Sequence, residues 1–185
     1  MKNKDLCKIR TITTFLSLSK DKTQWKEKIL QASRFCAELS ETFIKNAYTV
    51  QSVRIVTNPF GEYLNTENLE TAKDDLQTLS DYLNAPELSN IRVRFAIGEA
   101  KTAYEISLLP ELIKQFGDLC NVCVNVELDE YGILNNQKIR LAATAVQEIS
   151  QITPRGEGNF NFTVNFNCDP LIPYFPAQNN KTPIN

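Results

Sequence analysis

Apolar residues recur along the chain with two different periods, and these periods predict the order of its elements. Five short stretches alternate apolar with polar residues, as strands do, and four longer ones repeat apolar residues every three or four positions, as helices do. The predicted strands cover residues 8–18, 51–58, 90–97, 120–128 and 159–167. The first predicted helix covers 21–47, and the second is capped by Asn65 or Thr66 and ends at Pro86. The third covers 109–116, with Pro110 in its first turn, and the fourth begins at Asn135 or Asn136. This order predicts one α/β domain whose five mostly parallel strands are joined by right-handed crossovers.

The strands alternate so regularly that one face of the sheet is expected to be apolar and the other polar. In 120–128, four aliphatic residues alternate with two asparagines, a cysteine and Glu127. The polar positions of the second and third strands include Arg54, Arg92 and Arg94. The simplest arrangement places all four helices on the apolar face, so the sheet curls and its bare face becomes a polar lumen. Buried polar groups need partners, so these residues either hold a ligand or bond to one another and to solvent.

The last predicted strand carries a row of amides on its polar side. Between residues 159 and 167, four apolar residues alternate with four asparagines and a threonine. Pro170, Pro173 and Pro176 follow, and proline can continue neither a helix nor a central strand. We therefore expect 169–185 to form an irregular tail.

Composition excludes several classes of function. The chain has 185 residues, which suits a single domain, and its formal net charge of −2 gives no reason to expect nucleic acid or a membrane as a partner. No apolar run reaches the ~20 residues of a membrane span, and no secretory signal is recognisable, so we expect a soluble cytoplasmic protein. Histidine is absent, which excludes mechanisms that use a histidine base within this chain. The cysteines number five, without the spacing of a disulfide framework, so we expect reduced thiols.

Ligands of parallel sheets gather at the carboxyl ends of the strands, and this rule selects the candidate catalytic and metal-binding residues. Glu127 and Asp129 could act as an acid/base pair or bind Mg²⁺ or Ca²⁺, and the alternative is a solvated strand end. Cys168 could be a nucleophile beside Asp169, and the alternative is a packing cysteine. Neither a zinc motif nor a nucleotide motif is recognisable. Cys120 and Cys123 should lie on opposite faces of their strand, which excludes a zinc knuckle.

Arginines and amides on the polar face are the candidate ligand-binding residues. Arginine can hold a carboxylate or phosphate with two parallel hydrogen bonds, unless it forms salt bridges with Glu127 or with helix carboxylates. Asn58 could present a rigid amide at the rim of the sheet, and the alternative is a turn-capping role. The candidate ligand-binding residues are Arg54, Asn58, Arg92, Arg94, Asn125, Asn165 and Asn167.

Four stretches together resemble a known family. They are KIRTITTFLSL at 8–18, VQSVRIVTNPF at 50–60, NVEL with GIL at 125–134, and NFNF followed by NCDPLIPYFPA at 159–177. They are similar to the family catalogued as domain of unknown function 711 (uncharacterised protein family 0210), whose members share an IRT(I/V)T strand, a TNPF turn and an NFxF segment followed by prolines. The resemblance covers nearly the whole chain but only the N-terminal half of a typical member. It implies half of a ten-stranded α/β barrel like that of pyruvate formate-lyase, without a glycyl radical.

Three functions remain open at this point. The chain could be part of an enzyme that binds a small polar or anionic metabolite in a barrel lumen. It could instead be a non-catalytic half-barrel that binds a ligand, forms a homo-oligomer, or needs a separate C-terminal half, because exposed sheet edges invite pairing. It could also be a truncated, inactive fragment.

Overall fold

A computed structural model describes residues 7–88 and 92–169 of the chain. Its five strands form one parallel sheet in which spatial order equals sequence order. The strands are β1 (Ile12–Leu16), β2 (Val53–Thr57), β3 (Val93–Glu99), β4 (Asn121–Val126) and β5 (Phe162–Phe166). The predicted α/β architecture of parallel strands alternating with helices is therefore confirmed.

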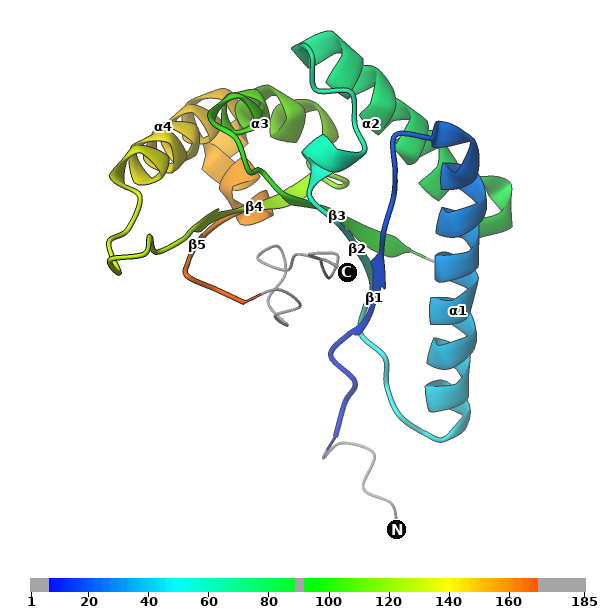
Figure 1. The fold of residues 1–185 in the computed structure, drawn as a ribbon. Coiled ribbons are helices and arrows are strands. Elements are labelled where there is room, and N and C mark those ends of the chain that lie inside the picture. Colours follow the sequence, from blue (N-terminus) through cyan, green and yellow to red (C-terminus); the bar gives the residue numbers. More distant parts are fainter. Residues whose placement is uncertain (1–6, 89–91, 170–185) are drawn as a thin grey trace.

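All four α-helices lie on one face of the sheet, as predicted, and the opposite face carries none of them (Figure 1). They are α1 (Trp25–Lys45), α2 (Leu69–Leu83), α3 (Ala103–Phe116) and α4 (Asn136–Ile152). Four short 3-10 segments join them to the strands, namely η1 (Lys22–Gln24), η2 (Phe60–Glu62), η3 (Pro86–Leu88) and η4 (Pro154–Asn161). Among the described residues, no helix is both long enough and apolar enough to cross a membrane.

The hydrophobic core fills the space between the helices and the sheet. Ile55, Phe95 and Val124 face it from the central strands, and Trp25 and Leu109 meet them from the helices. Each of these side chains is fully or almost fully buried. Burying one aliphatic or aromatic side chain of this size contributes about 1.5–3 kcal/mol, so this layer holds the helices against the sheet.

Two helices begin differently from the prediction: α3 begins earlier than its apolar pattern indicated, and α2 has a different cap. Helix α3 starts at Ala103, because Thr102 and Glu105 form a reciprocal capping box, and Pro110 therefore lies inside the helix instead of in its first turn. Helix α2 starts at Leu69, and its cap is Asn68, which forms a second capping box with Thr71, instead of the predicted Asn65 or Thr66. In both cases the capping side chains determine the start of the helix.

Strand β5 is shorter than the predicted strand at 159–167, and Phe160 consequently leaves the apolar face. Residues up to Asn161 belong to η4, and the Phe160 side chain is 83% exposed. The amide of Asn159 donates to the Val146 carbonyl at 3.2 Å, and the amide of Asn161 donates to the Gly117 carbonyl. These bonds hold the segment against α4 and the end of α3. Most of the predicted tail, residues 170–185, lies outside the described residues.

The helix-free face is polar at its two ends and apolar in its middle. Strand register aligns Thr13 with Arg54 and Arg94 near the amino ends. Val56 and Ala96 lie two positions further along, on the same face, and are fully buried. The predicted polar face is thus divided, with arginines at one edge and asparagines at the other.

Candidate functional site

Arginine side chains gather around a pocket at the amino ends of the strands. Arg54 and Arg94 are the second residues of β2 and β3, and Arg92 directly precedes β3. The pocket has a volume of about 560 Å³. We call it the arginine pocket, and its lining residues are Arg10, Arg54, Asn84, Arg92, Val93, Arg94, Asp118, Asn121, Phe160 and Asn161.

The arginine pocket is strongly positive. Among the described residues that line it, Asp118 is the one carboxylate, against four guanidinium groups. Burial, followed by the like charges of Arg94 and Arg10, lowers the pKa of Arg54 from its ordinary value. An anion in the pocket would relieve this repulsion.

Salt bridges of the described residues leave the charges of Arg92 and Arg94 uncompensated. They involve neither Arg92 nor Arg94, so the predicted alternative of pairing with helix carboxylates does not apply to these two. Arg10 donates a hydrogen bond to the Gln51 amide oxygen at 3.4 Å, which leaves its charge unchanged. The buried hydroxyl of Thr13, in the same row as Arg54, neither accepts nor donates a hydrogen bond within the described part of the chain. Buried polar groups normally have partners, so this edge of the sheet has bonding capacity for a ligand or water.

Asn58, at the carboxyl end of β2, is engaged by the protein itself. Its side chain accepts a hydrogen bond from Leu18 N at 2.9 Å and donates to Leu18 O at 3.2 Å. Its amide nitrogen also donates to Glu62 at 2.9 Å. The amide therefore extends the pairing of β1 with β2 beyond the last strand residue.

Asn125 does the same between β4 and β5. It donates to Cys168 O at 3.0 Å and accepts from Cys168 N at 3.1 Å. The backbone of Asn167 adds a hydrogen bond to Val126 O at 2.8 Å, and Asn165 is buried beside Asn125 in the register of the two strands. Asn125, Asn165 and Asn167 thus lie together at the carboxyl ends of β4 and β5, roughly 20 Å along the strands from Arg94.

A second pocket, of about 410 Å³, lies at the carboxyl end of β4 and has mixed charge. Glu127 and Asp129 line it together with Lys101 and Lys138, whereas Cys168 and Asp169 do not. Lys138 approaches Glu99 to 3.7 Å, and the Glu99 side chain is 1% exposed. This ion pair joins the first turn of α4 to the end of β3.

Asp129, one carboxylate of this second pocket, holds the loop that follows β4. Asp129 accepts hydrogen bonds from Tyr131 N at 2.9 Å and Ile133 N at 2.8 Å through one oxygen, which shapes the turn before α4. Within the described ranges, no group of three or more histidine, cysteine or acidic side chains is arranged to hold a metal ion. Lys101 is paired with Glu62 at 2.7 Å.

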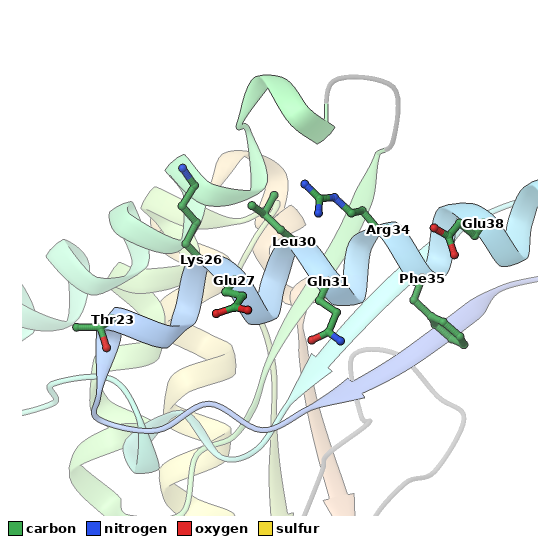
Figure 2. Close-up of a pocket in the computed structure, with 8 residues that line it drawn as sticks. All are labelled: Thr23, Lys26, Glu27, Leu30, Gln31, Arg34, Phe35 and Glu38. Atoms are coloured by element: carbon green, nitrogen blue, oxygen red, sulfur yellow. The ribbon is translucent and has the colours of Figure 1, made fainter.

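A larger hollow, of about 750 Å³, runs along the outer side of α1 (Figure 2). The described residues that line it come from η1 and α1. Figure 2 shows Lys26 and Arg34 pointing to one side of the helix, with Gln31 and Phe35 on the other. Because these side chains diverge and no second element of the described ranges lines the hollow, the described residues offer no convergent set of binding groups there.

The cysteines of the described residues form no disulfide with one another, and most of them are buried. Burial raises the pKa of Cys120 far above its ordinary value. Burial also raises the pKa of Cys36, against a hydrogen bond with Thr14. Cys168 is half-buried, with its Sγ 3.7 Å from Phe166 O. A thiolate nucleophile requires the opposite environment, one that favours the charged form.

The sequence reasoning missed several residues of the arginine pocket. Arg10, Asn121 and Asn161 lie before or at the start of β1, β4 and β5, and Phe160 was assigned to the apolar face. A signal was nevertheless present, because the amino ends of parallel strands share one edge. An alignment of the polar residues at those ends would have grouped Arg10 and Asn121 with Arg54, Arg92 and Arg94.

The comparisons with known proteins address the family of the chain. No curated protein matches it. A family model does, over residues 1–183, and its description is Uncharacterised ACR (DUF711). Since the match covers nearly the whole sequence, the chain belongs to this family.

Proposed function

We propose that the chain binds a small anion, such as a phosphate or a carboxylate, in the arginine pocket. The convergence of Arg92 and Arg94 with Arg10 carries the proposal, because Asp118, the one carboxylate among the described lining residues, does not balance these three guanidinium groups. Guanidinium groups match the oxygens of such anions in geometry as well as in charge. Asn84, Asn121 and Asn161 provide neutral polar groups around the same space.

The composition of the pocket favours binding over chemistry. The lining residues that the structure describes include no cysteine, serine or lysine that could serve as a nucleophile. The helix-free face onto which it opens would be the inner wall of the ten-stranded barrel that the family resemblance implies. In such a barrel the anion would lie at one mouth of the lumen, and the proposed role is to bind and orient a metabolite.

Substitution of Arg94 by glutamine tests this function. Arg94 is exposed, so Arg94→Gln removes a charge from the pocket without disturbing the core. A hydrogen bond to a charged group contributes about 1.5–3 kcal/mol, so the Kd for pyrophosphate should rise about tenfold or more, as measured by isothermal titration calorimetry. Arg34→Gln is the matched control, because Arg34 is an exposed arginine on α1 outside this pocket.

Two results would contradict the proposal. One is the absence of saturable heat with pyrophosphate, phosphate or a dicarboxylate at low ionic strength, where attraction between exposed charges is least screened. The other is an equal loss of affinity in the Arg34→Gln control, which would indicate general attraction to positive charge.

Assembly through the open edge of the sheet is a second candidate function, and the character of β1 favours it. Edge strands usually carry charge, proline or a bulge that prevents pairing. The sequence of β1 is ITTFL, which has neither charge nor proline, and its register with β2 is regular. Phe35, 57% exposed on the neighbouring α1, would add apolar contact. Two copies of the chain would pair along β1, and the mass in solution measures this directly.

A further inference from the structure

An exposed aromatic ring stands at the rim of the arginine pocket. Phe160 is 83% exposed, although it lines the same pocket as Arg92 and Arg94. A single exposed apolar side chain is common on protein surfaces and needs no functional explanation by itself. A phenyl ring beside several guanidinium groups is different, because it offers an apolar plane next to an anion-binding space.

The backbone on both sides of Phe160 is fixed, so the exposure of the ring does not result from a loose segment. The amide of Asn159 donates to Val146 O in α4 at 3.2 Å. The amide of Asn161 donates to Gly117 O, directly after α3. The hydrogen bonds of Asn159 and Asn161 therefore hold Phe160 at the pocket, and the ring itself packs against little of the protein.

We propose that the ligand of the arginine pocket is an aromatic or heteroaromatic phosphate monoester, whose ring stacks on Phe160. This inference rests on the proposed anion-binding function and specifies its ligand. A phosphate presents three terminal oxygens to the arginines, more than the two of a carboxylate. Arg92 and Arg94, which are exposed and belong to no ion pair of the described residues, are its first partners. A planar ring attached to the phosphate then covers apolar surface that would otherwise face water.

The experiment compares phenyl phosphate with methyl phosphate, which carries the same charged group without the ring. Titration calorimetry on the full chain should show phenyl phosphate binding about two- to tenfold more tightly, as expected for one stacked aromatic pair. Phe160→Ala should abolish this advantage and leave methyl phosphate unchanged, whereas Phe160→Trp should keep it. Phe166→Ala is the control, because Phe166 is an exposed phenylalanine at the far end of β5.

The outcomes separate this inference from the anion-binding function. If both phosphates bind equally well to the wild type, the ring contact is refuted and anion binding stands. The same conclusion follows if Phe160→Ala keeps the preference for phenyl phosphate. If neither phosphate binds, the anion-binding function fails and the inference fails with it.

Discussion

At the scale of single residues, asparagine side chains replace backbone groups where the strands end. Asn58 bonds to both backbone groups of Leu18, and Asn125 bonds to both backbone groups of Cys168. The sequence showed asparagines at these strand ends but not their partners, because the bonds join residues about 40 positions apart. A side-chain amide can donate and accept at the same time, so it can replace the next pair of backbone hydrogen bonds between two strands.

Glu62 links one of these amides to a lysine, and its titration gives a test of the network. Partial burial opposes ionisation of Glu62, but hydrogen bonds from Asn58 and Lys101 and the charge of Lys101 outweigh it, so its pKa is lowered. A lowered folded-state pKa stabilises the protein above the ordinary glutamate pKa of ~4.3, and this contribution disappears as the pH falls through the folded-state value. We expect Glu62→Gln to destabilise the protein at pH 7 and to differ less from the wild type as the pH falls below about 4.

Urea unfolding of both proteins at several pH values measures this difference. Glu130→Gln removes an exposed carboxylate from the loop between β4 and α4 and provides the control. A difference between Glu62→Gln and the wild type that stays constant from pH 7 to the acid limit would show that ionisation of Glu62 does not matter to stability.

At the scale of elements, Gly98 determines how closely β3 approaches the end of β2. It has φ +83, and a Cβ there would lie 2.4 Å from the backbone oxygen of Asn58. The pairing of β3 with β4 shifts register between Ala96 and Gly98. The sequence indicated that the strand closes at Gly98, whereas β3 continues through it to Glu99. A glycine in a strand can mark such a close approach instead of an end.

Alanine substitution at two glycines separates crowding from backbone strain. Gly132 also has positive φ, at +75, but a Cβ added there would have no other atom within 4 Å. Gly132→Ala should therefore cost about 1–2 kcal/mol, the cost of a left-handed conformation alone. In Gly98→Ala the added Cβ would also clash with the backbone of Asn58. We therefore expect a loss of about 3 kcal/mol or more in the free energy of unfolding, measured by urea titration. Equal losses at the two positions would refute the close contact with Asn58.

Helix starts and the last strand show where element prediction from sequence fails. The apolar stripe of α3 becomes clear only near Leu109, but the capping box of Thr102 and Glu105 starts the helix earlier. The alternation around Phe160 satisfied the period of a strand, yet the side chains of Asn159 and Asn161 bond to α4 and to Gly117 instead. In each case a specific polar contact overrode a correct hydrophobic period.

At the scale of the whole molecule, the alternation of parallel strands with helices and the placement of the helices on one face followed from the sequence, whereas the positions of the candidate sites did not. Parallel strands place Arg54 and Arg94 side by side, but at the opposite edge from Asn125 and Asn165. The prediction of a single site in the lumen combined residues from the amino ends and from the carboxyl ends of the strands. Which polar side chains lie close together depends on their positions along the strands more than on their residue types.

Pairing of two chains along β1 can be blocked at one backbone group. Ile12 N donates to Ser52 O, and N–H groups of successive strand residues point to opposite sides, so the N–H of Thr13 points to the open edge. Proline removes this N–H and is tolerated in edge strands, so Thr13→Pro should convert a dimer into a monomer in multi-angle light scattering. Thr13→Val keeps the N–H and should remain dimeric, and circular dichroism establishes that both variants fold. A wild type that is monomeric at about 100 µM, roughly a hundredfold above a micromolar Kd, would exclude assembly through this edge. So would a Thr13→Pro variant that stays dimeric, because the pairing would then use another surface.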